Sequence, residues 1–500
     1  MRLSRRDCIG AAALLIAGCS TPQPRPLTPL EMPPPAPREF RGAWVATVAN
    51  IDWPSAPGLP AAQQQAEIVR IVERAAALGL NALLLQVRPA ADAIYPSALE
   101  PWSEFVSGLQ GVAMDYDPLA FWISEAHRCG MELHAWFNPF RARHPSARSP
   151  LAAGHVAIAH PEWVRPYGDL LWLDPGEPAA QLHTLAVIAD VAARYNIDGV
   201  HIDDYFYPYP VTGLQGDKPF PDDASWQLAQ AAGNLLARDD WRRANVDGFV
   251  RALYERVHEV KPWLRVSISP FGLPRIERRP PGIEGFDPYA KLYADAQRWL
   301  AEGWLDAFAP QLYWPLASKG QPFALLLDAW ARDNVRGRHL WPGLFTSSVA
   351  TPPRDWPADE VMNQIALLRE RAPGGAGGHI HFSMAALMDD RGGIGAQVQA
   401  SNGETALVPA TPWLGAVAPA APSLLRERDR ILVVAAAGDA VQWFVLWQRR
   451  RGRWRMSLRP AHESLQVPLD DASLTAIAAS TLTRTGLESE RVSLRLLDHD

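Results

Sequence analysis

The sequence predicts an α/β protein: a (β/α)8 TIM barrel with a C-terminal fibronectin-like β-sandwich. Short apolar segments alternate with amphipathic helical windows eight times between residues 38 and 403, as a closed barrel of parallel strands requires. The rival fold, an open doubly wound sheet, normally has a glycine-rich turn after its first strand, and residues 46–54 contain no glycine. Past residue 405 the long helical windows stop, and short strand candidates follow one another.

The barrel elements are expected in strict alternation. The eight predicted strands are residues 40–48, 82–87, 132–137, 199–203, 265–269, 307–312, 339–344 and 379–382. The helical windows between them are residues 64–78, 118–129, 180–195, 246–260, 289–301 and 358–371.

The C-terminal region, residues 410–500, is predicted to form a fibronectin type III-like sandwich. Its strand candidates are residues 431–437, 440–448, 454–459, 474–482 and 491–497. Trp443, Trp447 and Trp454 suit either of two roles, packing of this module against the barrel or stacking on glycans.

The amino terminus has the features of a lipoprotein signal peptide, residues 1–18. Arginines precede the apolar run 8–18, and small residues precede Cys19. The run is far shorter than the roughly 20 apolar residues of a membrane-spanning helix. We therefore expect Cys19 to be lipidated. Ser4-Arg5-Arg6 also resembles a twin-arginine signal, which leaves the export route open.

Sorting and spacing can be predicted from the residues that follow Cys19. Ser20 stands where an aspartate would indicate retention in the inner membrane, so the sequence predicts an outer-membrane lipoprotein facing the periplasm. Residues 19–37 are rich in proline and are expected to form an extended, semi-rigid tether.

Charge and cysteine content restrict the function classes. The formal net charge is −6, and removal of the basic signal peptide leaves a mature chain of −8, which argues against nucleic acid as a partner. Cys129 is the one cysteine left besides Cys19, so no disulfide framework is predicted. The 20 tryptophans suit stacking on carbohydrate.

The strongest functional signal lies at the end of the fourth predicted strand. Asp203 and Asp204 close an apolar strand, and an aromatic loop follows them. Barrel enzymes keep their chemistry at the carboxyl ends of the strands. Side chains alternate along a strand, so Asp203 should point into the barrel mouth, and Asp204 can turn into it where the strand ends. The alternative is that one aspartate only caps the next element.

Other polar and aromatic residues fall at the same predicted rim. Amides and guanidinium groups bind sugar hydroxyls, and aromatic faces stack on sugar C–H surfaces. Arg88 has a structural alternative, an ion pair with a carboxylate. The predicted substrate-binding residues are Arg88, Asp92, Trp136, Asn138, His201, Tyr205, Gln311, Tyr313 and Trp314.

Seven separated motifs, in order, resemble the glycosyl-hydrolase-like barrel family of the divisome-localised glycosyl hydrolases over roughly residues 38–400. The motifs are residues 40–44, 51–54, 86–97, 134–139, 198–208, 268–272 and 309–314. The resemblance implies a lipoprotein that cuts peptidoglycan glycan strands, particularly denuded strands without stem peptides, near the division septum, with division-site proteins as partners. Ala90-Ala91 departs from the family, which commonly has Asp-Gly before the equivalent of Asp92.

Glycoside hydrolysis requires an acid for the leaving oxygen and a carboxylate that acts as nucleophile or base. Asp203 is the first candidate for nucleophile or base and Asp204 for its partner, with Asp92 and Asp52 as further candidates. A third route, with the substrate's N-acetyl group as nucleophile, is also compatible with adjacent aspartates.

Two rival functions remain open at this point. His379 and His381 share one face of a strand and suggest a metal-dependent hydrolase, although the fifth and sixth strands supply no histidine ligand. The other rival is a non-catalytic glycan-binding lipoprotein. The sequence favours the glycosidase, with no cofactor and no metal.

Overall fold

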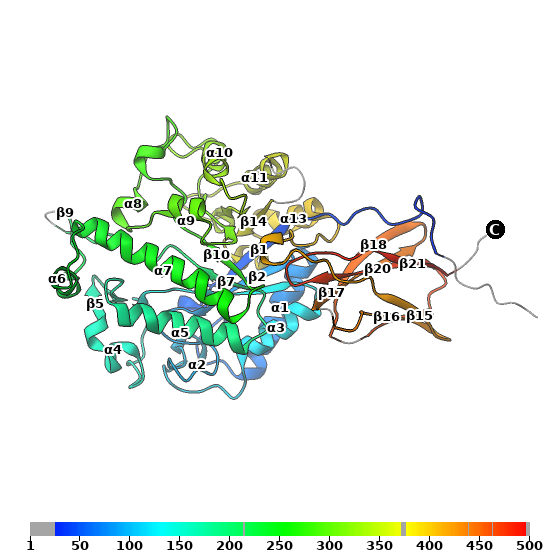
Figure 1. Ribbon diagram of the computed structural model, residues 1–500, viewed down its shortest axis with the longest axis horizontal. Coiled ribbons are helices and arrows are strands. Elements are labelled where there is room, and N and C mark those ends of the chain that lie inside the picture. The colour runs from blue at the N-terminus through cyan, green and yellow to red at the C-terminus, as the bar shows by residue number, and fades with distance from the viewer. Residues whose placement is uncertain (1–25, 214–215, 372–376, 439, 463, 497–500) are drawn as a thin grey trace, which may run out of the picture.

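The chain is organised around a parallel β-barrel, with a β-sandwich at one end (Figure 1). The computed structural model describes residues 26–213, 216–371, 377–438, 440–462 and 464–496. The barrel strands are β1 (Phe40–Val45), β2 (Ala82–Arg88), β3 (Glu132–Phe137), β7 (Gly199–Ile202), β10 (Arg265–Ile268), β11 (Ala307–Phe308), β12 (His339–Leu340), β13 (Gly343–Leu344) and β14 (Gly378–His381).

The barrel closes through its seventh strand, which is divided into β12 and β13. β12 pairs with β11 on one side, and β13 pairs with β14 on the other. The break falls at Trp341-Pro342, and proline has no amide N–H for the ladder. The eight predicted strands are therefore confirmed, and with them the TIM barrel.

The first and sixth strands are at least three residues shorter than predicted, for local reasons. The first ends at Val45 because the side-chain oxygen of Gln86 accepts hydrogen bonds from the backbone N–H groups of Thr47 and Val48. The sixth pairs regularly only over Ala307–Phe308, since Pro310 has no amide N–H to donate.

Helices cover the outside of the barrel. The main ones are α1 (Ala61–Ala77), α3 (Pro118–Arg128), α5 (Pro178–Arg194), α7 (Arg238–Val260), α9 (Ala296–Glu302), α10 (Phe323–Asp333), α11 (Ala358–Arg371) and α13 (Ile394–Asn402). All six predicted windows contain helix, but residues 289–301 divide into α8 (Pro288–Lys291) and α9. Tyr293 has a positive φ, and Asp295 caps the new helix by accepting a hydrogen bond from the Arg298 N–H.

Enlarged loops follow β3 and β7 at the carboxyl ends of the strands. The first contains β4 (Arg141–Arg143), α4 (Val156–Ala159), β5 (Val164–Tyr167) and β6 (Leu170–Leu173), and the second contains β8 (Thr212–Gly213), β9 (Gly216–Asp217) and α6 (Asp223–Ala231). The short helices α2 (Glu104–Ser107) and α12 (Met384–Met388) lie in other loops. In Figure 1 the loops after β3 and β7 lie on the left, and the sandwich lies on the right.

The C-terminal region is a sandwich of two antiparallel sheets. One sheet contains β15 (Ser423–Arg426), β16 (Arg430–Val434) and β19 (Leu465–Pro468); the other contains β18 (Arg453–Pro460), β17 (Val441–Arg450), β20 (Leu474–Thr483) and β21 (Val492–Arg495). Val433, Phe444 and Ile477 form part of the core between the sheets. β15 and β19 were not predicted from the sequence.

The outer face of the four-stranded sheet packs against the barrel. Trp443 and Trp447 are buried in this interface, and the Trp443 ring meets the His127 ring edge-on at 5.4 Å. A Cβ atom at Gly130 would lie 2.9 Å from the Cβ of Leu458, so the glycine permits this close approach. These two tryptophans therefore serve packing and are not available to stack on a glycan.

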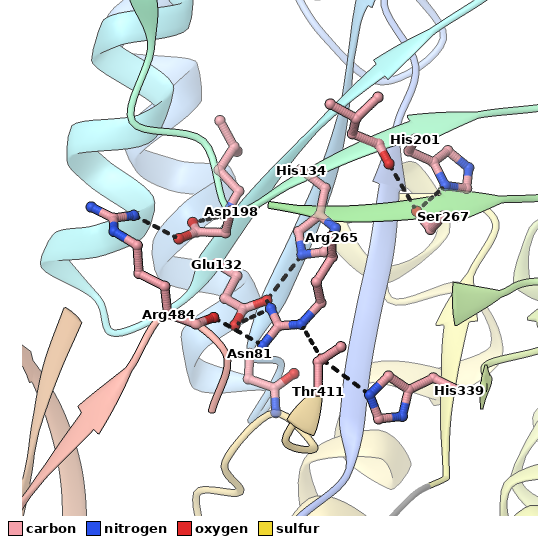
Figure 2. Close-up of polar contacts among 12 residues, drawn as sticks. Asn81, Glu132, His134, Asp198, His201, Arg265, Ser267, His339, Thr411 and Arg484 are labelled. Atoms are coloured by element: carbon pink, nitrogen blue, oxygen red, sulfur yellow. Dashed lines mark hydrogen bonds and ion pairs between the residues drawn. The ribbon is translucent and has the colours of Figure 1, made fainter. Parts of the chain in front are cut away.

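A buried polar network joins the amino-terminal end of the barrel to the sandwich (Figure 2). Arg265 donates to both oxygens of Glu132 at 2.8 Å, to the Thr411 hydroxyl at 2.8 Å and to the Arg484 carbonyl at 3.2 Å. Gln442, from β17, donates to Asp198 at 3.1 Å. The sandwich therefore covers the end of the barrel opposite the enlarged loops.

The described part of the predicted tether does not form a free spacer. Residues 26–37 lie along the sandwich, where the Leu27 N–H donates to the Ser493 hydroxyl at 3.1 Å and Arg491 donates to the Pro34 carbonyl at 2.8 Å. The predicted signal peptide and Cys19 lie outside the described residues. Within the described ranges, no helix combines the length and apolar character needed to cross a membrane.

Replacing Arg265 by alanine is expected to lower the free energy of unfolding by about 3–5 kcal/mol, because it leaves the Glu132 carboxylate buried without its cation. Urea denaturation measures this change. Arg251→Ala, which removes an exposed ion pair on α7, is the control and should leave stability nearly unchanged. Equal effects of the two substitutions would contradict the assignment of Arg265 to this network.

Candidate active site

A cavity of about 300 Å³ lies at the carboxyl ends of the barrel strands. All eight barrel strands, or the loops that directly follow them, contribute to its walls. The lining residues are Trp44, Ala46, Val48, Ile51, Gln86, Trp136, Arg141, His144, Asp203, Asp204, Tyr205, Tyr209, Ser269, Gln311, Tyr313, Phe345 and Phe382.

Asp203 is held by a chain of side-chain amides. Gln86 donates to the side-chain oxygen Oδ1 of Asn138, and the Asn138 side-chain amide donates to Oδ2 of Asp203. Gln86 is held in turn because its Oε1 accepts hydrogen bonds from the backbone N–H groups of Thr47 and Val48 in the first barrel loop. The chain fixes the rotamer of Asp203 from two neighbouring strands.

Asp204 has a separate set of partners on the other side of the strand end. The Tyr209 hydroxyl donates to Oδ2 of Asp204, from five residues further along the same loop segment. Gln311, which also lines the cavity, donates to the Ser269 carbonyl at 3.0 Å, and its amide lowers the pKa of Asp204. The two carboxylates are thus oriented independently.

The environment favours the protonated forms of both aspartates. Burial, and secondly the charge of Asp204, raise the pKa of Asp203 from 3.8 to about 8. Burial also raises the pKa of Asp204. The pair therefore holds a proton near neutral pH, which is the state needed to donate one to a leaving group.

Aromatic side chains form much of the remaining wall. The Tyr313 ring stacks on Phe345 with centroids 4.8 Å apart, and Phe382 lies 5.6 Å from Tyr313 and 6.1 Å from Trp44. Trp136 completes this group across the cavity. Such rings offer apolar faces to sugar C–H groups or to a methyl group.

His201 lies beneath the cavity as a support. Trp44 donates its indole N–H to Nε2 of His201 at 3.0 Å, so Nδ1 carries the proton and donates to the Ser267 hydroxyl at 2.8 Å. Figure 2 shows the His201–Ser267 contact. Burial holds the pKa of His201 well below 6.5, so the ring stays neutral. It fixes the orientation of Trp44.

The structure brings six of the predicted site residues to the cavity. These are Asp203, Asp204, Trp136, Tyr205, Gln311 and Tyr313. The side chains of Asn138 and His201 do not line the cavity: both are buried, and each is hydrogen-bonded to a residue that does, Asn138 to Asp203 and His201 to Trp44. Trp314 is also not a lining residue, since its half-buried ring packs against Phe271 at 5.7 Å.

Arg88 and Asp92 do not line the cavity, and each is bonded to other protein groups. Arg88 is 0% exposed and forms a two-pronged ion pair with Glu100, the alternative that the sequence left open. Asp92 accepts hydrogen bonds from the Ala90 N–H and the Gln110 amide. Ala91 has φ 51°, a conformation that suits glycine, which explains why Asp-Gly is common there in the resembled family.

The other candidate acids do not line the cavity either. Asp52 accepts hydrogen bonds from the N–H groups of Ala46 and Ala385 and from the Ser383 hydroxyl, so its oxygens organise the loops after β1 and β14. Among the described residues, the cavity-lining carboxylates are Asp203 and Asp204.

The metal alternative lacks a set of ligands in the part of the chain that the structure describes. No group of three or more His, Cys, Asp or Glu side chains there is placed to hold a metal ion. Nδ1 of His381 is hydrogen-bonded to the Thr346 hydroxyl at 2.8 Å, and the His379 and His381 rings meet edge-on.

Several residues that line the cavity were not among the predicted site residues. Trp44, Gln86 and Arg141 lie inside or directly beside the quoted motifs, and Tyr209 follows Tyr205 by four residues in the aromatic loop. Arg141 donates to the backbone carbonyl of Pro89 and to the side-chain oxygen Oδ1 of Asn138, each at 2.8 Å, and its guanidinium group lies over the Tyr205 ring. Phe345 and Phe382 carried no signal, because isolated aromatic residues after short strands are common in cores.

Comparison with known proteins identifies the family. The glycosyl hydrolase-like 10 family model matches residues 39–358. The chain belongs to this family. It is 38% identical over 408 residues to "Glycosyl hydrolase YngK" of Bacillus subtilis (strain 168), covering 78% of this chain and 77% of that protein. It is 32% identical over 388 residues to "Glycosyl hydrolase DigH" of Escherichia coli (strain K12), covering 71% of this chain and 86% of the relative.

A solved structure with a similar outline is the PgaB (BpsB) glycoside hydrolase domain from Bordetella bronchiseptica. It is 15% identical, with a TM-score of 0.47, and the match covers 75% of this chain and all of that one. Family membership and the two named relatives support a glycosidase.

Asp203→Asn is expected to stabilise the protein at pH 8 by more than about 1 kcal/mol, the value of roughly one pKa unit. Because folding raises the pKa of Asp203, its stabilising contribution is full below pH 4 and is lost as the pH rises to about 8. An asparagine is neutral at every pH in this range, so the variant does not lose this stability. Urea denaturation at pH 4 and pH 8 measures the difference in stability. Asp240→Asn, at an exposed position of α7, is the control. A stability difference that does not change with pH would contradict burial of an ionisable Asp203.

Proposed function

We propose that this protein is a glycoside hydrolase that cleaves the glycan strands of peptidoglycan, with denuded strands at the division septum as its preferred substrate. The observation that carries the hydrolase assignment is the buried Asp203–Asp204 pair, which holds a proton near neutral pH inside an aromatic-lined cavity. The substrate rests on the resemblance of the seven motifs to the divisome-localised glycosyl hydrolases. Division-site proteins are the proposed protein partners.

The carboxylate pair supplies the proton chemistry of glycoside hydrolysis without a cofactor. One carboxylic acid protonates the leaving glycosidic oxygen, and a carboxylate supports the developing positive charge at the anomeric carbon. A glycan-binding protein would not need two adjacent carboxylates that repel each other in a buried site. We therefore place hydrolysis ahead of binding alone.

We also propose that the protein is an outer-membrane lipoprotein facing the periplasm, anchored through Cys19. Residues 26–37 lie along the sandwich, and the sandwich covers the amino-terminal end of the barrel. The described chain begins at residue 26 beside the sandwich, on the side away from the enlarged loops after β3 and β7 (Figure 1). An anchor attached before this residue would leave the cavity directed toward the cell wall.

Asp203→Asn and Asp204→Asn are each expected to reduce cleavage of peptide-free glycan strands at least roughly 100-fold, because each removes a group that carries or balances the transferred proton. Mass spectrometry of the released fragments measures cleavage, and strand co-sedimentation measures binding. Asp247→Asn, a buried aspartate on α7 bonded to Trp299, is the matched control and should retain activity. Full activity of both cavity variants would contradict the proposed site.

Cys19→Ala is expected to abolish incorporation of labelled palmitate and to release the protein from the outer-membrane fraction, because the thiol is the proposed point of lipid attachment. Membrane fractionation of cells that express the two forms measures the change. Retention of Cys19→Ala in the outer membrane would contradict the anchor.

A further inference from the structure

Both cavity carboxylates come from the end of one strand. Asp203 and Asp204 are consecutive residues at the end of one strand, whereas the lining residues that the other seven strands contribute are aromatic, amide, apolar, hydroxyl or basic. A retaining enzyme with a protein nucleophile, or an inverting enzyme with a protein base, needs carboxyl groups that flank the glycosidic bond. The described cavity lacks a carboxylate on the opposite side.

The site contains an unsatisfied donor and an unsatisfied acceptor next to the aspartate pair. Oδ1 of Asp203 and Nε1 of Trp136 are buried, and neither completes a hydrogen bond. The indole N–H is nevertheless near enough to lower the pKa of Asp203. An amide presents one N–H donor and one carbonyl acceptor, so it is the chemical complement of these two atoms.

The walls around these atoms suit the methyl end of an acetamido group. Trp44, Trp136, Tyr313, Phe345 and Phe382 line the same cavity, and the rings of all but Trp136 pack against one another. A methyl group gains from contact with such faces, whereas a sugar hydroxyl would need polar partners. The pocket therefore combines amide-matching polar atoms with an apolar enclosure.

We propose that the cavity binds a 2-acetamido sugar on the non-reducing side of the cleaved bond, and that the acetamido oxygen of this sugar, not a protein carboxylate, is the nucleophile. Asp203 accepts the hydrogen bond of the acetamido N–H, and Asp204 is the general acid and base. This inference rests on the proposed glycan-strand hydrolase, whose substrate carries 2-acetamido groups, and it specifies which atom attacks.

The first step forms one bond and breaks one. The acetamido oxygen bonds to the anomeric carbon as the bond from that carbon to the leaving oxygen breaks, and the leaving oxygen takes its electron pair and the proton of Asp204. The resulting five-membered ring is positively charged at nitrogen, and the Asp203 carboxylate balances that charge. In the second step water attacks the anomeric carbon, gives a proton to Asp204 and restores the acetamido group.

Substrate binding also distributes the proton correctly within the pair. A donor N–H at Oδ1 favours the ionised form of Asp203. Since two neighbouring carboxylates share their protons, ionisation of Asp203 favours a protonated Asp204. The acetamido group that becomes the nucleophile therefore also keeps Asp204 protonated as the general acid.

The deciding experiment uses the full chain and peptide-free glycan strands that have been de-N-acetylated and re-acylated with either acetyl or trifluoroacetyl groups. Fluorine withdraws electrons from the attacking oxygen, so the trifluoroacetyl strands should be cut at least tenfold more slowly at equal binding. Proton NMR of the first products from acetylated strands should show retention of anomeric configuration. Mass spectrometry of the quenched enzyme should show no glycosyl adduct.

Equal rates on the two strands, inversion of configuration or an adduct on Asp203 would overturn the inference and leave the proposed hydrolase intact. Failure to cut the acetylated strands would instead overturn the proposed function.

The variant Trp136→Phe, which keeps the ring and loses the N–H, should lower kcat about tenfold with a smaller change in KM. Trp304→Phe, in a half-buried tryptophan packed beside Arg298, is the matched control and should leave both constants unchanged. An unchanged kcat for Trp136→Phe would also count against the inference.

Discussion

The site depends on keeping two neighbouring carboxylates out of water at the end of β7. Water would ionise both, and two adjacent charges would repel each other. The structure prevents this by burial, and it uses neutral partners to hold the pair: the Asn138 amide on Asp203 and the Tyr209 hydroxyl on Asp204. The nearest cation, Arg141, is directed to backbone and amide oxygens and to the Tyr205 ring. The pKa values of both aspartates are raised because burial outweighs the hydrogen bonds and the charge of Arg141, which lower them.

Such a site needs a rigid barrel, and the sandwich contributes to that rigidity from the opposite end. Arg265 connects the barrel strands β3 and β10 through Glu132 and reaches Thr411 and the Arg484 carbonyl in the C-terminal region. Apolar packing of Trp443 and Leu458 against α3 and the loop that follows it surrounds this polar network. The C-terminal module is therefore part of the support of the barrel, which explains why its tryptophans are buried.

The strand ends that hold the acids could be predicted because alternation and motif order identify them directly. The sequence did not allow us to predict which of the rim residues face the cavity and which bind other protein groups. Arg88, Asp92, Asn138 and His201 have the residue types of sugar ligands, yet each one binds another protein group behind the cavity wall. Residue type and strand position place a side chain at the rim, but its rotamer and its partner decide whether it faces the cavity. The partners, such as Glu100 and Ser267, lie on distant segments, and no local pattern indicates them.

The burial of these four residues gives the cavity its chemical character. The Asn138 amide, the Arg88 guanidinium group and the His201 imidazole are occupied elsewhere, and aromatic side chains form much of the wall. Among the lining residues, the buried polar atoms without a hydrogen bond are Oδ1 of Asp203 and Nε1 of Trp136. A cavity lined by sugar-hydroxyl ligands on all sides would hold many polyols equally well. A cavity that places an unpaired donor and an unpaired acceptor beside aromatic rings discriminates for an amide, because an analogue without the amide would leave both polar atoms unpaired. Selectivity for an acylated amino sugar therefore depends on the four polar side chains that are bonded away from the cavity as well as on the unpaired donor and acceptor that remain in it.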